Sequence, residues 1–258
     1  MWAPAMTKPV LLIRADGNQD DAQALAELGI ETVIDPYIRI DRAQDATDAQ
    51  RLLAELALPG SKWLIATSVN AIRRFAELVG ADVLRNAIAS SIDLNFAAVG
   101  ERTAQSLRDL GATEVLTPEL SDSAALAEML ANIGTQRGPQ TAIIPSGLLA
   151  MKTLPNKLEA AGWKLIQGVV YTTVTVAVEP ETATAARAGD FSAVIFRSPS
   201  AARAFLSFVP APNMPLVAAG FTTAKVIEDA GLTVASIPSN PTPKSVATAV
   251  SELLKGDR

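Results

Sequence analysis

Five short segments of this sequence join the end of an apolar, strand-like run to the start of a helix, and each carries glycine or a hydroxyl residue. The first N–H groups of a helix have no partner within it and favour an anion, so these segments suit an acidic ligand. In open α/β sheets, ligands bind at the carboxyl ends of the strands. The alternative is that the hydroxyls only cap helices and that the nearby arginines are exposed solubility charges. The candidate substrate-binding residues are Arg14, Ser68, Asn70, Gly100, Arg102, Thr103, Ser146, Gly147, Arg197, Ser198, Ser200, Gly220, Thr222 and Thr223.

Tyr171 is the candidate catalytic residue. The chain has no Cys and no His, which excludes thiolate nucleophiles, cysteine metal sites and the usual serine triad. Catalysis must then use carboxylates, Lys, Tyr, hydroxyls, backbone dipoles or the reactivity of the substrate. A phenol can donate a proton or a hydrogen bond to a leaving hydroxyl. The alternative for Tyr171 is an amphipathic strand residue whose tip lies in water.

Standard motifs and large charged patches are missing from this sequence. It contains no G-x-G-x-x-G, no Walker loop and no G-x-S-x-G elbow, which counts against dinucleotide, P-loop and serine-hydrolase enzymes. Asp16, Asp20 and Asp21 are read as acids at a helix start rather than as a metal site. The net charge of −5 argues against general nucleic-acid binding. With no apolar run of membrane-spanning length and no secretory signal, a cytoplasmic monomer is expected.

A duplication organises the chain. Residues 95–118 align without a gap with residues 215–238, and residues 63–75 align with residues 193–205. Each aligned copy reads as a strand, a polar or glycine turn and a helix. Two halves built alike indicate two similar lobes that face each other across a cleft.

The alternation of strands and helices predicts an α/β fold with two similar parallel-sheet lobes. The segment Tyr37 to Ile40 alternates like an exposed strand, and the β-branched run after Tyr171 is expected to pair with it as a two-stranded antiparallel linker. The residues between the helix ending near 79 and the strand beginning near 95 are expected to be irregular. A sequential division near residue 135 is the competing arrangement. The expected parts are lobe 1 at 1–36 plus 177–258, lobe 2 at 41–170, and linker strands at 37–40 and 171–176.

Taken together, these segments resemble uroporphyrinogen-III synthases over nearly the whole chain. Each motif is short, and the resemblance lies in their order and spacing. The segments that carry it are VLLIR (10–14), WLIATSVNAIRRF (63–75), FAAVGERTAQSLRDLGA (96–112), GVVYTT (168–173), AVIFRSPSAARAF (193–205) and VAAGFTTAKVIEDAGL (217–232).

The resemblance implies a bilobal lyase with a two-stranded ladder between its lobes. It implies a linear tetrapyrrole with eight carboxylates, hydroxymethylbilane, as substrate. The family closes this linear molecule into a ring, inverts the terminal pyrrole and releases water without cofactor or metal. By position, Tyr171 resembles the family tyrosine proposed to assist hydroxyl loss. Thr103 and Thr223 resemble its glycine-turn threonines, and Ser68 and Ser198 its strand-end serines.

One segment departs from the family pattern. The family often has an Arg near 146–152, whereas this chain reads SGLLAMK, with Lys152 as its only basic residue. This departure keeps open a non-catalytic tetrapyrrole-binding or regulatory module with the same bilobal fold. A two-lobed sugar- or amino-acid-binding protein is a third alternative.

Overall fold

The computed structural model describes residues 8–120, 122–138 and 140–256. Its contacts divide the chain into two compact units. Unit 1 is Met1–Arg39 with Val174–Arg258, and unit 2 is Ile40–Thr173. The alternative boundary near residue 135 falls inside unit 2, in the last turn of the helix Ser123–Arg137.

Unit 1 has a four-stranded parallel sheet in the order β10-β9-β1-β2. β1 pairs on both sides, with β2 and with β9, so its run VLL is buried on both faces. The strands are β1 Val10–Leu12, β2 Thr32–Ile34, β9 Ala193–Phe196 and β10 Leu216–Ala218. The helices are α1 Asn18–Ala26, α8 Ala183–Ala188, α9 Pro199–Phe208, α10 Phe221–Asp229 and α11 Pro243–Gly256.

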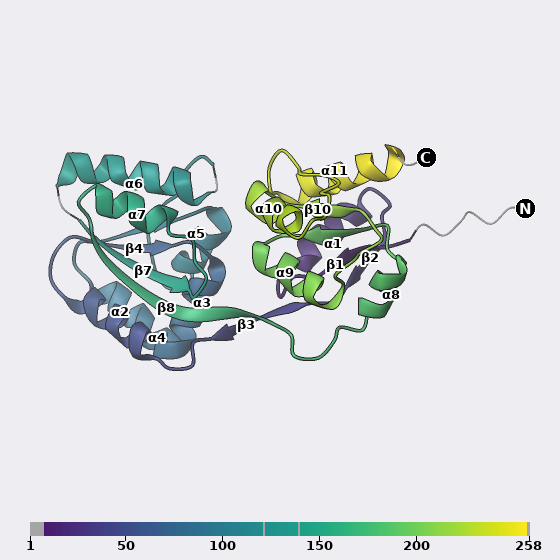
Figure 1. Cartoon of the computed structure of the whole chain (residues 1–258). Coiled ribbons are helices and arrows are strands. Elements are labelled where there is room, and N and C mark those ends of the chain that lie inside the picture. The colour runs from purple at the N-terminus through teal and green to yellow at the C-terminus, as the bar shows by residue number, and fades with distance from the viewer. Residues whose placement is uncertain (1–7, 121, 139, 257–258) are drawn as a thin grey trace, which may run out of the picture. The chain divides into compact units, whose positions relative to one another are not determined.

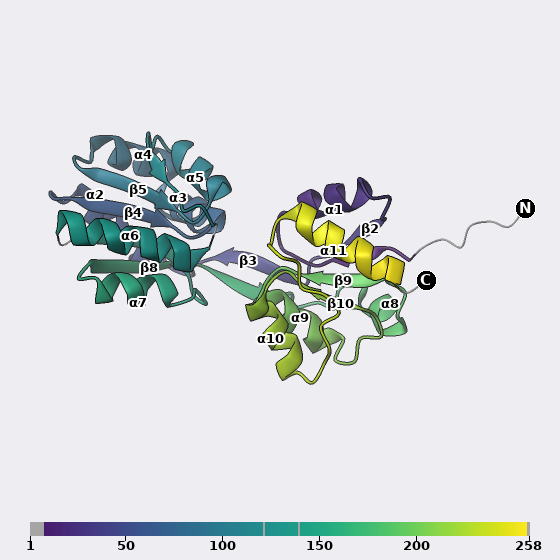
Figure 2. The same ribbon diagram turned by 90° about the horizontal axis from the view of Figure 1, so that it is seen from above.

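Alternate strand residues of unit 1 pack into two separate cores, one on each face of the sheet. Val10 and Leu12 of β1 pack with residues of α1 and α11, and these two helices lie side by side on one face (Figures 1 and 2). Leu11 and Ile13 pack with residues of α8, α9 and α10 on the opposite face. The period of two along a strand therefore makes a three-layer unit whose strands all end at one edge.

Unit 2 has a larger sheet in the order β3-β8-β7-β4-β5-β6. The neighbours from β8 to β6 are parallel. β3 and β8 run antiparallel, because Ala43 donates to the carbonyl of Val170 and Val176 donates to that of Tyr37. The strands are β3 Ile38–Arg42, β4 Lys62–Ala66, β5 Leu94–Ala98, β6 Val115–Leu116, β7 Thr141–Gly147 and β8 Lys164–Thr175. The helices are α2 Thr47–Ala57, α3 Val69–Val79, α4 Ala81–Ser90, α5 Glu101–Arg108, α6 Ser123–Arg137 and α7 Thr153–Ala160.

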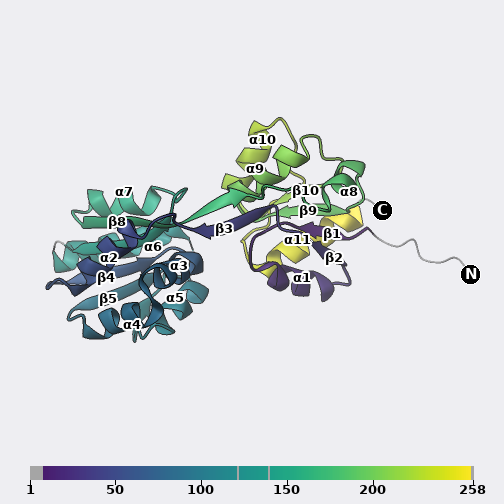
Figure 3. The ribbon, with the colours of Figure 1, turned by 90° about the horizontal axis from the view of Figure 1, so that it is seen from below.

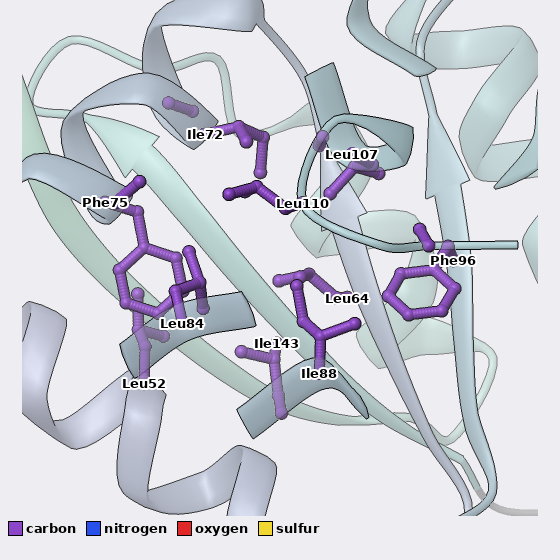
Figure 4. Packing of buried hydrophobic residues seen from close by; sticks show 14 of the residues in the cluster. Leu52, Leu64, Ile72, Phe75, Leu84, Ile88, Phe96, Leu107, Leu110 and Ile143 are labelled. Carbon is purple, nitrogen blue, oxygen red and sulfur yellow. The ribbon is translucent and has the colours of Figure 1, made fainter. Parts of the chain in front are cut away.

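The sheet of unit 2 is also covered on both faces. Leu64, Phe96 and Ile143 point into a core with α2 to α5, which cover one face of the sheet (Figures 3 and 4). Trp63 and Ile65 of β4 point to α6 and α7 on the other face (Figure 1). This doubly covered parallel sheet confirms the predicted α/β class.

The duplicated segments have matching backbone geometry. Gly100 precedes α5 with φ −178° and ψ 171°, and Gly220 precedes α10 with φ −175° and ψ 165°. Ser68 and Ser198 are both extended and both accept an N–H from the residue three positions on, at 3.1 and 3.2 Å. One difference follows the turns: the first copy continues into β6, whereas the second makes only an isolated bridge between Val217 and Ser236.

Two expectations about local structure were wrong. Residues 81–90 form the helix α4, whose Leu84 and Ile88 complete the core beside α2 and α3. Its apolar residues at a spacing of four were the overlooked signal. The segment from Tyr37 was read as exposed, but Tyr37 and Ile38 are buried.

Tyr37, just before β3, contacts two other segments of unit 1: the helix α9 and the residue before α8. Its ring packs against Phe205 and Phe208, and its hydroxyl lies 3.1 Å from Thr182 Oγ1. Thr182 Oγ1 donates to Asp35 at 2.9 Å, so the phenol must be the donor to Thr182. Burial raises the pKa of the Tyr37 phenol above 10.0; the Thr182 bond opposes this and the Asp35 carboxylate adds to it.

We expect Tyr37→Phe to cost about 1 kcal/mol of unfolding free energy at about pH 7, because one buried hydrogen bond is lost. A pKa raised by folding gives stability that is complete below the unfolded pKa and is lost as pH rises through the folded pKa. The difference between wild type and Tyr37→Phe should therefore shrink above about pH 10. Urea unfolding at about pH 7 and about pH 10.5 measures it, and a difference that stays constant would contradict the assignment.

Candidate functional site

The carboxyl edge of the unit 2 sheet brings together three of the predicted residues. Ser68 follows β4 and begins α3, where its Oγ accepts the Ala71 N–H at 3.1 Å. Its Oγ also lies 3.3 Å from the hydroxyl of Tyr171 on β8. Gly147 ends β7 beside the Tyr171 ring. A phenol, a second hydroxyl and a helix start thus meet at one point of this edge.

Tyr171 lies between the core and the surface. It is partly buried and packs against the cluster that contains Val170 and Leu52. The phenol is held on one side by apolar groups and reaches the polar edge with its hydroxyl. The Tyr171 side chain is partly exposed, and its hydroxyl has Ser68 Oγ as a partner.

The other predicted residues of unit 2 differ in what they offer. Thr103 is buried, and its N–H and that of Ala104 return to the Gly100 carbonyl. Ser146 is also buried, and its hydroxyl donates to the Gly168 carbonyl at 3.3 Å. The structure gives Ser146 a role inside the sheet.

Two further predicted residues of this edge lie on helices. Asn70 is in the first turn of α3, and its side-chain oxygen accepts from Arg73 at 3.0 Å. Arg102 is exposed in the first turn of α5. Glu101 in the same turn pairs with Arg108, and this contact holds the pKa of the Glu101 carboxyl below its ordinary value.

Unit 1 has a pocket of about 490 Å³ at the carboxyl edge of its own sheet. Five predicted residues line it, with the start of α10 at one wall and the segment 237–241 at another. The lining residues are Arg14, Arg197, Pro199, Ala219, Gly220, Phe221, Thr222, Thr223, Ile237, Pro238, Ser239, Asn240 and Pro241.

The α10 wall of this pocket is formed by the start of a helix that has no side-chain cap. The N–H groups of Thr223 and Ala224 bond to the Gly220 carbonyl, so the open end of the helix is formed by those of Phe221 and Thr222. Phe221 is 81% exposed and adds an apolar surface beside them. The pocket therefore combines helix N–H groups, a hydroxyl and an aromatic ring.

Arg14 also lines this pocket. It follows β1, and its backbone is held by Asn18, which donates to the Arg14 carbonyl at 2.8 Å. Its guanidinium lies over Gly17, where an added Cβ would be 3.4 Å from Arg14 Nη1. Gly17 has φ +74°, a conformation that favours glycine. The glycine turn thus lets the arginine lie close to the backbone that starts α1.

Arg197 lines the pocket but uses its donors within the protein. Nε donates to Asp21 Oδ2 at 2.9 Å, Nη2 pairs with Oδ1, and Nη1 donates to the Pro241 carbonyl. The side chains of Arg197 and Asp21 are 8% and 2% exposed. The structure therefore shows an internal ion pair that fixes the 237–241 wall, where the sequence suggested a direct ligand contact.

The two remaining residues of unit 1 lie at the start of α9. Ser198 caps this helix through the Ala201 N–H, and Ser200 is half-buried in its first turn. Neither lines the pocket.

The sequence reasoning missed the wall formed by residues 237–241. Asn240 accepts the Thr242 N–H at 3.2 Å and the Thr242 hydroxyl at 2.6 Å, in the turn that leads to α11. The available signal was the Pro-Ser-Asn-Pro-Thr-Pro run, which is typical of an ordered turn. Its role as a pocket wall depends on Arg197, which is remote in sequence.

The described residues offer neither a metal-binding cluster nor a membrane-spanning helix. Within residues 8–120, 122–138 and 140–256, no group of three or more His, Cys, Asp or Glu residues could hold a metal ion. No helix in that part of the chain is long and apolar enough to cross a membrane.

A family model matches most of the chain. The model described as uroporphyrinogen-III synthase HemD covers residues 19–248. That range includes both carboxyl edges, although Arg14 precedes it. No curated protein sequence matches the chain.

Solved structures of similar fold cover the chain from end to end. Uroporphyrinogen-III synthetase from Helicobacter pylori aligns with a TM-score of 0.64 at 17% identity, over 98% of this chain and 100% of that one. A mutant uroporphyrinogen III synthase from the extremely thermophilic bacterium Thermus thermophilus aligns with a TM-score of 0.61 at 16% identity, over 96% and 99%. At this identity, the likeness shows a shared fold.

We expect Asp21→Ala to cost about 3 kcal/mol of unfolding free energy, because it leaves the Arg197 charge buried without its partner. The exposed pair of Asp82 and Arg85 supplies the control: Asp82→Ala should cost less than about 1 kcal/mol. Replacing both members, as Asp21→Ala with Arg197→Met, should recover part of the loss. Urea unfolding of the four proteins measures this, and equal losses for the two Asp variants would refute it.

Proposed function

Because the chain belongs to the uroporphyrinogen-III synthase family, we propose that its two sheet edges bind the substrate and that Tyr171 assists the loss of water. The family consists of lyases of haem biosynthesis, which cyclise hydroxymethylbilane with inversion of the terminal pyrrole to give uroporphyrinogen III. The roles of individual residues below are part of the proposal.

The observation that carries the proposal is the placement of the Tyr171 hydroxyl. It lies at the carboxyl edge of the unit 2 sheet, 3.3 Å from Ser68 Oγ, where ligands of parallel sheets bind. The ring packs against the core, so the hydroxyl has a fixed position. A group held in this way can act at one atom of a bound substrate.

The proposed step uses the phenol as an acid. Pyrrole nitrogen electrons expel the hydroxyl, the carbon–oxygen bond breaks, and the Tyr171 proton leaves with the hydroxyl as water. The Tyr171 oxygen is then an anion, to which the Ser68 hydroxyl can donate. The methylene carbon left by the hydroxyl bonds to the substituted α-carbon of the terminal pyrrole, and the older bond between that α-carbon and its neighbouring methylene breaks. This freed methylene then bonds to the other α-carbon of the same pyrrole, which inverts the ring. The last α-carbon loses one proton, and this proton restores the phenol. The sum is cyclisation with loss of one water.

The substrate carboxylates are assigned to helix starts and to Arg14. The protein itself has a net charge of −5, so a polyacid needs local sites rather than a general positive surface. The open end of α10 and Arg14, which line the same pocket, supply one such site in unit 1. The start of α5 after Gly100 supplies the corresponding one in unit 2.

In this proposal the two units correspond to the two lobes of the family, and β3 with β8 to the ladder between them. Each of these strands contains one of the boundaries between the units. Uroporphyrinogen-III synthases from two bacteria share the whole-chain fold, which supports the correspondence.

One observation favours the alternative of a binding module without turnover. The loop after Gly147 exposes Leu148, Leu149 and Met151 at 61–64% and has Lys152 as its only basic residue. A loop of this kind offers apolar contact to pyrrole rings rather than a carboxylate partner. Binding of uroporphyrinogen without formation of the type III isomer from hydroxymethylbilane would decide for the alternative.

We expect Tyr171→Phe to lower kcat for the type III isomer by at least about tenfold, since a positioned acid contributes about 10²–10⁴-fold and the pyrrole supplies part of the drive. Tyr37→Phe is the matched control, because the chain has two tyrosines and Tyr37 lies in a buried network of unit 1. Fresh hydroxymethylbilane with isomer-resolved product analysis gives both rates. Wild-type turnover by Tyr171→Phe would remove the catalytic role.

Arg14→Gln should raise KM for hydroxymethylbilane by about tenfold and leave kcat within about threefold, because it removes a charged contact made before and during the reaction. Arg85→Gln, on an exposed ion pair of α4, is the charge-matched control. Initial rates over a range of substrate concentrations separate the two constants. An unchanged KM would take Arg14 out of the binding site.

A further inference from the structure

A bulge in the sheet of unit 2 sets the direction of Tyr171. The pairing of β7 with β8 runs one to one from Thr141 and Lys164 to Ser146 and Val169. Gly147 then pairs with Tyr171, so Val170 is the extra residue. A one-residue shift turns the following side chain to the other face of a strand. As a result, Val170 and Tyr171 both pack into the same core.

The Tyr171 ring occupies the space that a side chain at Gly147 would need. A Cβ on Gly147 would lie 2.6 Å from Cζ, 2.8 Å from Cε2 and 3.0 Å from the hydroxyl oxygen of Tyr171. Gly147 does not have a positive φ, so its requirement is one of space rather than of backbone conformation. The ring of Tyr171 therefore lies next to the backbone of Gly147, in the space that a side chain there would fill.

Backbone hydrogen bonds hold both partners of this contact. Leu148 donates to the Tyr171 carbonyl at 2.9 Å, and Ala150 donates to the Gly147 carbonyl at 3.0 Å. Ser68 is held by the hydrogen bond that its Oγ accepts from the Ala71 N–H, and the same Oγ lies 3.3 Å from the phenol oxygen. Hydrogen-bonded backbone thus lies beside the Tyr171 ring, and Ser68 is the fixed partner of its hydroxyl.

We infer that Gly147 and Ser68 are positioning residues, which aim the Tyr171 hydroxyl at the leaving hydroxyl of the substrate. The inference rests on the proposed role of Tyr171. It changes the role expected for Gly147 from a backbone contact with the substrate to a missing side chain that makes room for the catalytic ring. Ser68 acts through the phenol oxygen and needs no contact with the substrate.

The kinetic test is a double-mutant cycle. Gly147→Ala should lower kcat about tenfold or more with a smaller change in KM, because a displaced acid affects the chemical step. In a Tyr171→Phe background, the same change should cause no further loss of kcat. Gly168→Ala, on the neighbouring strand β8, is the control, because its Cβ would meet the Leu52 side chain at 2.8 Å and not the tyrosine. It should keep kcat even if its melting temperature falls.

The outcomes separate this inference from the proposed function. If Tyr171→Phe turns over like the wild type, the catalytic role of Tyr171 fails. If Tyr171→Phe is slow but Gly147→Ala has wild-type kcat, or if the two losses multiply in the double variant, the positioning role fails.

A spectroscopic test keeps the inference open to refutation if Gly147→Ala folds poorly. Protein labelled with 3-fluorotyrosine should give two ¹⁹F resonances, one for each tyrosine, and Tyr37→Phe assigns them. Ser68→Ala should shift the Tyr171 resonance and leave that of Tyr37. Ser198→Ala removes the equivalent helix cap in unit 1 and should leave the Tyr171 resonance unchanged. An unshifted Tyr171 resonance in Ser68→Ala would overturn the contribution of Ser68.

Discussion

The hydrogen-bonding demand of helix starts is the constraint on which both candidate binding edges depend. A helix leaves its first N–H groups without internal partners, and a buried start must find acceptors for them. Ser68 and Ser198 meet that demand with a hydroxyl, whereas Gly100 and Gly220 leave the helix tip free of a side-chain cap. Each sheet edge has one helix start of each kind, capped by a serine or preceded by a glycine. One fixes the scaffold, and the other leaves N–H groups for an external anion.

Charge is used sparingly at these edges. Much of the basic side-chain inventory is engaged within the protein, as with Arg197 on Asp21 and Arg108 on Glu101. A buried ion pair of this kind contributes geometry more than net stability. In the proposed function, the anion therefore meets helix dipoles whose direction is set by the fold, together with a small number of cations. Such preorganised groups need little rearrangement when the ligand binds.

Local and repeated features of the structure could be predicted from the sequence. The duplication predicted the matched turns at Gly100 and Gly220 and the matched caps at Ser68 and Ser198, because each depends on a few adjacent residues. The helix α4 was available from its apolar spacing and was overlooked.

Features that depend on remote partners could not be predicted in this way. Asp21 looked like an ordinary acid at a helix start, since its partner Arg197 lies 176 positions later. The bulge at Ser146 and Gly147 leaves no mark on the residue pattern, yet it decides where Tyr171 points. The 237–241 segment reads as a turn, and only the tertiary contact of Pro241 makes it a wall.

The discontinuity of unit 1 has a consequence for how the protein is made. Leu11 of the central strand β1 pairs with Val194 of β9, so it must wait for most of the chain to leave the ribosome. Unit 2 is continuous and can fold during that interval, because domains tend to fold as they emerge. Meanwhile the apolar run VLL of β1 lacks its neighbour on one side, and an open strand edge invites wrong pairing. Unit 1 is thus the part whose assembly is completed last during synthesis.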